Sequence, residues 1–267
     1  MGLPEPSVSN TALVTGASSG IGASIAAEFA SRGYSLVLVA RREERLRSLA
    51  TELSSDHSVD AEIITADLGD EGDRDRLQEE LRSRGRAVEV LVNNAGFGHQ
   101  ADFAPSPRDR MVEMVRVNVE AVVDLTSRFI GPMVERGRGS VINIASTAAF
   151  QPLPGSAVYA ASKSFVLSFS EALRTELRGS GVTVTAVCPG PVRTEFTEVA
   201  GVGGVEERTP GAVWMSAEEI ARHAVDGAKH DKRVVVPGTL NRVTALAGQH
   251  SPRAVALPLI SRVWRNI

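Results

Sequence analysis

Short apolar runs alternate with longer stretches of helical periodicity along most of the chain. The apolar runs are nearly continuous, as in strands that helices cover on both faces. They span residues 11–15, 35–40, 61–66, 88–92, 140–145, 182–188 and 233–236. The helical patterns span residues 21–32, 42–54, 71–84, 107–136, 157–179 and 217–230. This alternation predicts βαβ units in an α/β fold, a doubly wound sheet of about seven parallel strands with helices on both faces.

The length of 267 residues is compatible with one domain or two, and the pattern contains no linker and no internal repeat. We expect a single domain over 1–267, with a cofactor-binding and catalytic core over 10–193. The segment 194–214 is rich in glycine, which is typical of a substrate lid or a mobile loop. Residues 238–267 form a basic, apolar C-terminal arm.

The composition narrows the class of protein. Apolar residues make up 43% and charged residues 23%, which predicts a globular chain with a full core. The net charge of -3 gives no support to nucleic-acid binding. One cysteine excludes an internal disulfide, and five histidines without paired spacing give no indication of a metal site. The start of the chain lacks the features of a secretory signal, so we expect a cytoplasmic protein.

A glycine-rich loop, TGASSGIG at 15–22, lies where the first predicted strand meets the first predicted helix. Its glycines would allow a tight turn and expose N–H groups at the helix start to a pyrophosphate. The spacing G-x-x-x-G-x-G differs from the usual dinucleotide fingerprint, so an ordinary glycine-rich turn is the alternative. The cofactor residues that we predict in this loop are Gly16, Ser18, Ser19, Gly20, Ile21 and Gly22.

Two arginines follow the second predicted strand. An NAD site usually has Asp or Glu at the position that Ala40 occupies, whereas an NADP site has a cation nearby for the 2′-phosphate. Arg41 and Arg42 therefore favour NADP(H) over NAD(H), unless they only begin the polar face of the next helix. Asp67, with Leu68 beside it, follows the third strand and either contacts the adenine or caps a helix.

Tyr159 and Lys163 share one face of a predicted helix at spacing i, i+4. Lys163 is the only lysine in the first 228 residues of a chain with 26 arginines and 3 lysines. A nearby ammonium lowers the pKa of a tyrosine from its usual value near 10. A compact ammonium also suits ribose hydroxyls better than a planar guanidinium does. The pair therefore indicates acid/base chemistry beside a nucleotide, and a surface helix pair is the alternative.

Two further polar residues stand at informative places. Ser146 ends the fifth predicted strand, where its hydroxyl could donate to a substrate oxygen. Asn118 lies in an apolar stretch of the long helix over 107–136. A buried amide needs partners, so Asn118 either holds a water chain or satisfies a kink in the backbone.

Taken together, these motifs resemble the short-chain dehydrogenase/reductase family. The resemblance covers residues 10–238 and rests on TGASSGIG, NNAG at 93–96, Asn118, Ser146, Tyr159-x-x-x-Lys163 and PGPVRT at 189–194. It implies one Rossmann-like domain and NAD(P)-dependent interconversion of an alcohol and a carbonyl.

The resemblance also implies a role for each matching residue. Tyr159 would be the general acid/base, Lys163 would lower its pKa and bind the nicotinamide ribose, and Ser146 would orient the substrate oxygen. Asn118 would support a proton relay, and Arg41 occupies the position that separates NADP from NAD forms. The remaining cofactor residues would be Asn93, Ala95, Gly96, Pro189, Gly190, Val192 and Thr194. Homodimers or homotetramers through the helices at 107–136 and 157–179 are implied as well.

The sequence gives little information about the substrate. Several apolar residues could wall a pocket together with Phe150, or could only pack the lid onto the body: Phe196, Val199, Val202, Trp214 and Met215. We expect a hydrophobic small molecule, such as a ketone, a 3-oxoacyl chain or a steroid-like alcohol. Ser146, Tyr159 and Phe196 would contact it.

Other classes of function stay open. An NADP-binding regulator on the same fold would not need the tyrosine–lysine pair. Residues 232–267 carry six basic residues and no Asp or Glu, which would suit an anionic membrane surface or an acidic subunit. We favour the simpler interpretation that this tail packs as C-terminal helices. An isomerase or dehydratase is a closer rival, although such relatives usually carry a larger C-terminal substrate domain.

Overall fold

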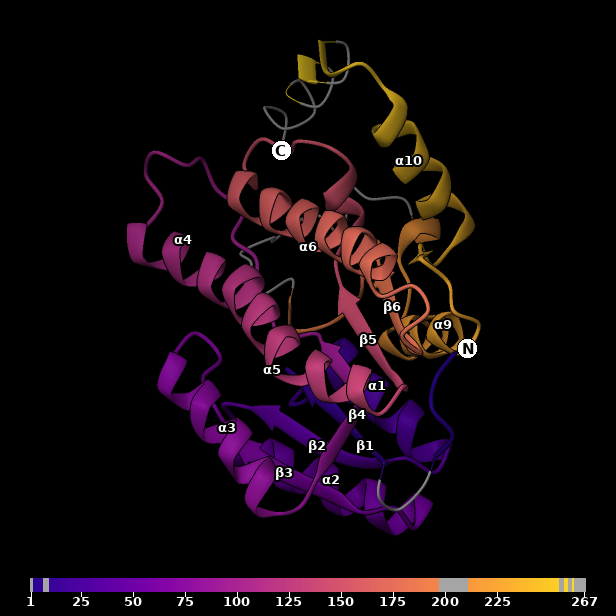
Figure 1. The fold of residues 1–267 in the computed structure, drawn as a ribbon. Coiled ribbons are helices and arrows are strands. Elements are labelled where there is room, and N and C mark those ends of the chain that lie inside the picture. Colours follow the sequence, from indigo (N-terminus) through magenta and orange to yellow (C-terminus); the bar gives the residue numbers. More distant parts are fainter. Residues whose placement is uncertain (1, 7–9, 197–210, 255–256, 259–260, 262–267) are drawn as a thin grey trace.

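A parallel sheet of seven strands forms the centre of the computed structural model, which describes residues 2–6, 10–196, 211–254, 257–258 and 261 (Figure 1). The strands are β1 (Asn10–Thr15), β2 (Ser35–Ala40), β3 (Ala61–Thr65), β4 (Ala87–Asn93), β5 (Gly139–Ile144), β6 (Val182–Val187) and β7 (Val234–Val235). Their order in the sheet is β3-β2-β1-β4-β5-β6-β7, and every pairing is parallel. This confirms the predicted doubly wound α/β fold of seven strands.

Helices follow the strands and cover both faces of the sheet. They are α1 (Gly20–Ser31), α2 (Glu43–His57), α3 (Glu71–Ser83), α4 (Arg108–Val115), α5 (Ala121–Glu135), α6 (Ala157–Glu176), α9 (Ala217–Lys229) and α10 (Thr239–His250). Short 3-10 turns lie at Thr147–Phe150 (η2) and Gly211–Val213 (η3). Among the described residues, no helix is both long enough and apolar enough to span a bilayer.

The two faces of the sheet have separate apolar cores. One face packs against α1, α2 and α9, where Phe29, Leu46 and Ala224 are fully buried. The other packs against α3 and α5, where Leu77 and Leu125 are buried. Strands β2, β5 and β6 are buried at every position, which fits the mostly apolar runs of the sequence pattern. The buried polar side chains among them include Asn143 of β5 and Thr185 of β6.

The long helix predicted over 107–136 is interrupted. A π-helical turn, η1 (Arg116–Glu120), separates α4 from α5. Asn118 lies in this turn and is fully buried. Such turns shift the direction of the helix backbone and are frequent at functional sites. The π turn is therefore the first structural indication that this helix serves the site.

Two predicted segments extend outside the described residues, the lid for most of its length and the C-terminal arm for a third of it. Most of the expected lid over 194–214 coincides with residues 197–210, which include Val199 and Val202. Within the expected C-terminal arm over 238–267, α10 is described and packs on the body through the buried Asn241 and Ala245. Figure 1 shows α10 at one end of the molecule, beyond α6.

Candidate active site

A cavity of about 620 Å³ lies at the carboxyl edge of the sheet. The strand order reverses here between β1 and β4, and sheets of this type bind ligands at that point. The lining extends from Arg41 and Asp67, past the glycine loop, to Tyr159 and Trp214. Its volume is within the range of pockets for cofactors and small molecules.

The glycine loop is shaped so that a ligand can approach its backbone. Gly16 has φ +65° and Gly20 has φ +54°, backbone angles that residues with a side chain rarely adopt. A Cβ on Gly22 would lie 2.3 Å from the carbonyl oxygen of Gly16, so no side chain fits there. All six predicted loop residues, including Ser18, Ser19 and Ile21, line the cavity. The loop fits a dinucleotide phosphate because glycine leaves its wall open at the start of α1.

The loop after β4 differs from the prediction in one residue. Asn93 is buried and points away from the cavity, where its Nδ2 donates to Asn143 Oδ1 (2.8 Å) and Thr126 Oγ1 (3.0 Å). The neighbouring Asn94 lines the cavity instead, and its Nδ2 donates to the Thr15 carbonyl (2.8 Å). Side chains alternate along a strand, so these neighbours point in opposite directions. Ala95 and Gly96 line the cavity as predicted.

Charged side chains gather where β2 and β3 end. The predicted cofactor residues Arg41, Arg42, Asp67 and Leu68 all line the cavity. Arg41 lies 3.7 Å from Asp67 Oδ2, so the two residues form a loose ion pair. Arg42 Nη2 donates to Ser18 Oγ at 3.0 Å and to Ser19 at 2.6 Å, which attaches α2 to the glycine loop.

Glu195 was missed by the sequence reasoning, although it directly follows the PGPVRT motif. Its carboxylate accepts from Arg42 Nη1 (2.9 Å) and from Arg45 Nη1 (2.5 Å). Hydrogen bonds from Arg45 and Arg42 lower the pKa of Glu195 to about 2. Glu195 lines the cavity, so an internal anion already occupies the arginines nearest the glycine loop.

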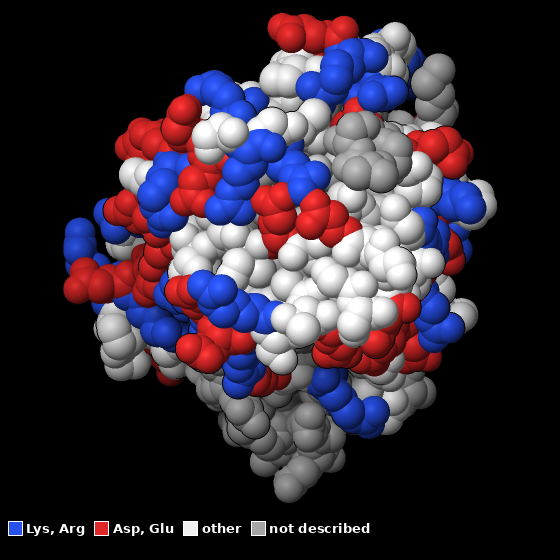
Figure 2. Space-filling view, turned by 90° about the horizontal axis from the view of Figure 1, so that it is seen from below, with Lys and Arg blue, Asp and Glu red and all other residues white. Residues whose placement is uncertain are grey.

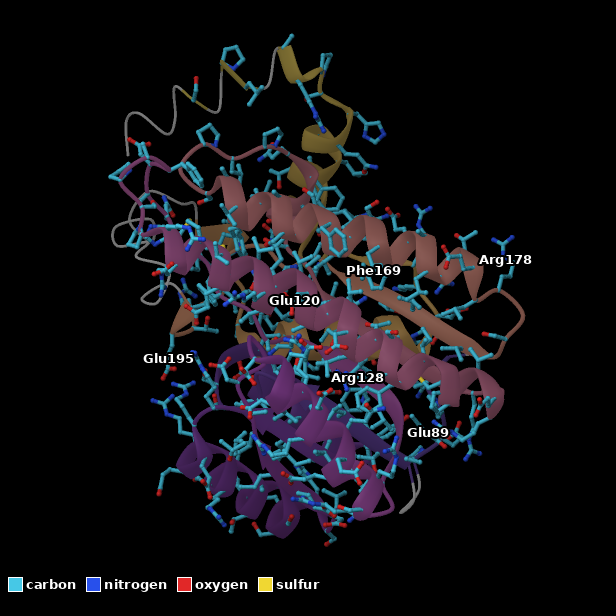
Figure 3. The ribbon with its side chains drawn as sticks, turned by 60° about the vertical axis from the view of Figure 1, so that its left-hand side comes forward. Glu89, Glu120, Arg128, Phe169, Arg178 and Glu195 are labelled. Atoms are coloured by element: carbon cyan, nitrogen blue, oxygen red, sulfur yellow. The ribbon has the colours of Figure 1, made fainter. Side chains whose placement is uncertain are left out.

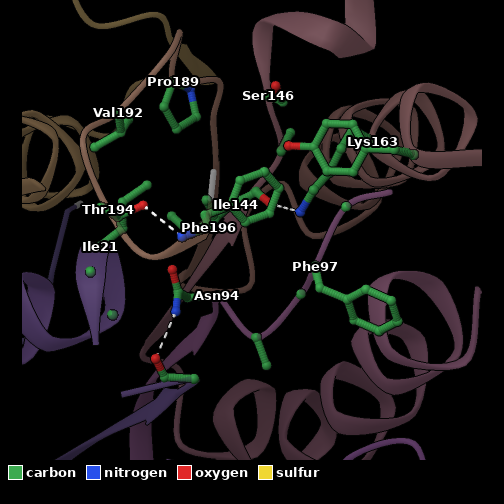
Figure 4. A pocket seen from close by; sticks show the side chains of 18 of the residues that line it. Ile21, Asn94, Phe97, Ile144, Ser146, Lys163, Pro189, Val192, Thr194 and Phe196 are labelled. Carbon is green, nitrogen blue, oxygen red and sulfur yellow. Dashed lines mark hydrogen bonds between the residues drawn. The ribbon is translucent and has the colours of Figure 1, made fainter. Parts of the chain in front are cut away.

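The predicted catalytic residues meet at the other end of the cavity. Ser146 caps η2, where its Oγ accepts from the Ala148 N–H at 3.1 Å, and both Ser146 and Tyr159 line the cavity. Lys163, one turn further along α6, is 5% exposed. Its Nζ donates to the Ile144 carbonyl at 2.8 Å and lies 5.9 Å from the Tyr159 ring centre. Figure 4 shows Ser146 and Lys163 on one side of this pocket, across from Val192 and Thr194.

Burial controls the protonation of this pair. It raises the pKa of Tyr159 above its ordinary value of 10, against the opposing effect of the Ser146 hydrogen bond. It also lowers the pKa of Lys163 to about 8. The expected lowering of the tyrosine pKa by Lys163 is therefore outweighed by burial. At neutral pH the phenol keeps its proton and the lysine remains an ammonium, so Tyr159 is set to donate a proton.

Asn118 fixes the loop after β4 from within the π turn. Its Nδ2 donates to the Phe97 carbonyl (3.0 Å) and to Ser162 Oγ (3.1 Å), and its Oδ1 accepts from the Phe97 N–H (3.1 Å). The amide therefore satisfies backbone groups of the loop after β4, and the expected water chain stays a prediction. A Cβ on Gly96 would lie 2.9 Å from Asn118 Oδ1 and 3.4 Å from Lys163 Nζ. Asn118 and Lys163 therefore both lie against Gly96.

The remaining wall comes from the chain after β6 and from the C-terminal part of the molecule. Pro189, Gly190, Val192 and Thr194 line the cavity, as predicted. Val192 forms a parallel bridge with Met215, which holds this segment beside α9. Thr244 and Ala245 of α10 also line the cavity, so the C-terminal helix contributes to the site.

Aromatic and aliphatic side chains share the end of the cavity beyond Tyr159 with several polar ones. Phe196 lies with its ring 5.6 Å from the Tyr159 ring, and the buried Trp214 lines the same region. Phe150 and Met215, which the sequence also suggested, pack into other apolar clusters outside this lining. The other lining residues at this end are Phe97, His99, Gln100, Gln151, Leu153 and Ser156.

Comparison with known proteins identifies the family of this chain. Residues 10–201 match the family model described as short chain dehydrogenase. The chain is 41% identical over 198 residues to sulfoacetaldehyde reductase 2 of Chromohalobacter salexigens, covering 72% of this chain and 76% of that protein.

Two solved structures resemble the whole molecule. A short-chain dehydrogenase from Sphingobium yanoikuyae in complex with NADPH has a TM-score of 0.81 at 35% identity, covering 94% of this chain and 95% of that one. A bulky-bulky ketone specific alcohol dehydrogenase from Comamonas testosteroni has a TM-score of 0.75 at 31% identity, covering 91% of this chain and 95% of that one. The fold, the site and these matches show that the chain belongs to the short-chain dehydrogenase/reductase family and is an oxidoreductase of alcohols or carbonyl compounds.

Proposed function

We propose that this protein reduces a neutral, apolar ketone to a secondary alcohol with NADPH. The observation that carries the proposal is that Ser146, Tyr159 and the buried Lys163 line one cavity together with the glycine loop on one side and Phe196 and Trp214 on the other. A reductase needs an intact acid/base set of this kind, whereas a nucleotide-sensing regulator does not.

The residues of the chain divide the chemistry among them. A bound nicotinamide would supply the hydride, which forms the new C–H bond at the carbonyl carbon. Tyr159 donates its phenolic proton to the carbonyl oxygen as the C=O π bond opens, and general acid catalysis of this kind typically contributes about 10²–10⁴-fold. Ser146 donates a hydrogen bond to the same oxygen. The tyrosinate left behind is stabilised by the Lys163 ammonium and regains its proton from solvent.

The preference for NADPH rests on the arginines after β2. The glycine loop and the segment from Pro189 to Thr194 would hold the pyrophosphate and the nicotinamide. Arg41 and Arg42 would receive the 2′-phosphate, since guanidinium groups bind phosphate in charge-assisted pairs. The site has Ala40 at the position where a ribose-binding carboxylate would favour NAD. The likeness to the NADPH complex of the Sphingobium yanoikuyae enzyme supports this preference.

The substrate preference rests on the lining beyond Tyr159. Phe97, Leu153, Phe196 and Trp214 present apolar surface there, and the described part of this lining contains no arginine. A carboxylate or sulfonate would lose its hydration without meeting an arginine in this lining, which disfavours it. Arg110 and Arg193 contact the Phe97 and Trp214 rings but do not line the cavity. The likeness to the bulky ketone alcohol dehydrogenase supports a large neutral substrate.

We also expect a homodimer or homotetramer. Several exposed apolar side chains lie on the helices where the family resemblance places the interface, namely Val112, Val115, Val123 and Phe165. Phe165 and Phe169 stack on α6 with ring centres 5.8 Å apart. Sedimentation equilibrium at micromolar concentration tests this expectation, and a monomer would contradict it.

The test compares the rate of NADPH consumption with neutral ketones and with an anionic aldehyde. We expect turnover of aryl or long-chain ketones at a kcat/KM at least tenfold above that of sulfoacetaldehyde, and faster with NADPH than with NADH. A preference for sulfoacetaldehyde would contradict the assigned substrate class. NADPH binding without turnover of any carbonyl would instead favour a regulator.

A further inference from the structure

A buried arginine lies between α3 and α5, outside the residues that line the cavity. Arg74 is 2% exposed and is the largest of the fully buried side chains in the described chain. A charge in that position is tolerated only when it is paired and hydrogen-bonded. Its partners therefore indicate what the arginine holds in place.

The guanidinium of Arg74 joins three separate segments. Its Nη1 donates to the carbonyl oxygen of Leu68 at 2.7 Å, in the loop after β3. Its Nη2 donates to Glu120 Oε1 at 2.6 Å, at the end of the π turn. Its Nε donates to Asp124 Oδ2 at 2.5 Å, in the first turn of α5. Figure 3 shows Glu120 and Arg128 along the side of α5 that approaches α3.

Two of these segments are walls of the cavity. Leu68 lines the cavity beside Asp67, and Val117 of the π turn lines it as well. The two walls approach each other, because a Cβ on Gly69 would lie 3.5 Å from Val117 Cγ2. Asp67 is itself held within its loop, since its carboxylate accepts from the Gly69 N–H at 3.0 Å. Arg74 thus fixes the distance between Leu68 and Val117 from behind.

The hydrogen bonds of Arg74 are better suited to positioning the three segments that it joins than to stabilising the fold. Replacing a buried ion pair by apolar residues of similar volume is often neutral or stabilising, so its charge is weak evidence for stability. A planar guanidinium does supply fixed donor directions, which hold three acceptors in one geometry. Two charged acceptors and a backbone carbonyl from three segments are what such a group can align.

We propose that Arg74 is a positioning residue for the adenosine half of the cofactor, acting through Leu68 and the loop after β3. The inference rests on the proposed NADPH-dependent function. Removing the guanidinium frees the loop after β3 and so weakens binding of the adenosine half, while the nicotinamide half is held by residues that Arg74 does not touch.

The test uses adenosine 2′,5′-bisphosphate, which contains only the adenosine half with its 2′-phosphate, and reduced nicotinamide mononucleotide, which contains only the other half. For Arg74→Met, we expect calorimetry to show at least tenfold weaker binding of the bisphosphate. Binding of the mononucleotide should stay within twofold of wild type.

Arg174→Met is the matched control. Arg174 is a partly buried arginine whose Nη1 donates to Asp231 Oδ1 (2.6 Å) and to the Val184 carbonyl (3.1 Å), away from the cavity. We expect this variant to lose thermal stability and to bind both probes as wild type does. If Arg74→Met loses stability but binds the bisphosphate like wild type, Arg74 is only structural and the proposal is wrong.

A milder variant covers the case in which Arg74→Met does not fold. Glu120→Gln changes a half-exposed partner and leaves the guanidinium in place. We expect about threefold weaker binding of the bisphosphate, and unchanged binding would contradict the proposal. Failure of the wild-type protein to bind the bisphosphate would overturn the proposed cofactor itself, which is a distinguishable result.

Discussion

The two ends of the cavity hold their cations in opposite ways. At the catalytic end, Lys163 is almost fully buried and donates to a backbone carbonyl, that of Ile144. At the adenosine end, Arg42 and Arg45 are about half exposed and share the Glu195 carboxylate. Burial moves the pKa of Lys163 to about 8, whereas exposed ion pairs are weak and are screened by salt.

This difference in the exposure of the cations indicates how each end of the cavity contributes to function. The catalytic end works by desolvating a small number of groups, so changes there should alter rates and pH dependence. The adenosine end works by the number of its charges, so changes there should alter affinity and the response to salt. Figure 2 shows acidic and basic side chains interspersed over one face of the molecule, which fits an exterior on which most charges have local partners.

The largest effect is expected for Lys163→Met. We expect kcat to fall at least about 100-fold, because the tyrosinate loses its neighbouring cation. Burial lowers the pKa of Lys163 from 10.5 to about 8, so the unfolded chain binds more protons between those pH values, and wild-type stability rises with pH across that window. Below pH 8 the buried ammonium costs stability, so the variant should be more stable than wild type at pH 7.

Urea unfolding of both proteins at pH 7 and pH 10 measures this difference. The stability advantage of Lys163→Met should shrink as the pH rises, because wild-type Lys163 loses its proton. A variant that is less stable than wild type at pH 7 would show that burial of the ammonium is not costly.

Gly96→Ala tests the catalytic end through packing. The added Cβ would lie 2.9 Å from Asn118 Oδ1, so the π turn or Lys163 must move. We expect kcat to fall at least about tenfold, since small displacements at a site are costly. Gly131→Ala is the control, because a Cβ there meets nothing within 4 Å. Equal activity of both variants would separate Asn118 from catalysis.

Arg42→Ala tests the adenosine end. We expect NADPH binding to weaken about tenfold and NADH binding to weaken less, because only NADPH carries the 2′-phosphate, whereas the bonds from Arg42 to Ser18 and Ser19 support the glycine loop for both cofactors. Fluorescence titration measures both constants. Arg47→Ala removes another arginine of α2, one that pairs with Glu43 outside the cavity lining, and should leave both constants unchanged. Equal losses for NADH and NADPH would assign Arg42 a role other than cofactor selection.

The smallest effect is expected for Glu195→Gln. The carboxylate of Glu195 shares Arg42 and Arg45 with an incoming 2′-phosphate, so removing its charge should strengthen NADPH binding about two- to fivefold. The gain should diminish as salt is raised from 50 mM to 500 mM, because the groups are exposed. Weaker NADPH binding by the variant would show that Glu195 orients the arginines and does not compete for them.

Much of the fold could be predicted from the sequence, because near-continuous apolar runs depend only on local composition. The strand predicted over 35–40 matches β2 (Ser35–Ala40), and the helix predicted over 217–230 matches α9 (Ala217–Lys229) to within a residue. A kink at Asn118 was one of two interpretations of the sequence, but the π turn itself was not predicted, since the helical periodicity continues through it. Asn118 in this turn contacts the backbone of Phe97, a tertiary interaction that periodicity does not encode.

The site was partly predictable for the same reason. The glycine loop and the Tyr159–Lys163 spacing are local signals, and the structure brings both to one cavity. The choice between Asn93 and Asn94 depends on which residue ends the strand, and sequence patterns locate strand ends poorly. Glu195 and Arg74 act through partners far away in the chain, so their roles become visible only in three dimensions.

The proposed reduction depends on a proton from Tyr159, and Tyr159→Phe removes that proton while keeping the ring. NADPH-dependent reduction of an aryl ketone should be measured for this variant, for wild type and for Tyr34→Phe, which alters the other tyrosine, bonded to the Pro4 carbonyl. We predict that kcat falls at least about 100-fold in Tyr159→Phe alone, with NADPH binding within twofold of wild type. Wild-type turnover by Tyr159→Phe would contradict the proposed role of Tyr159.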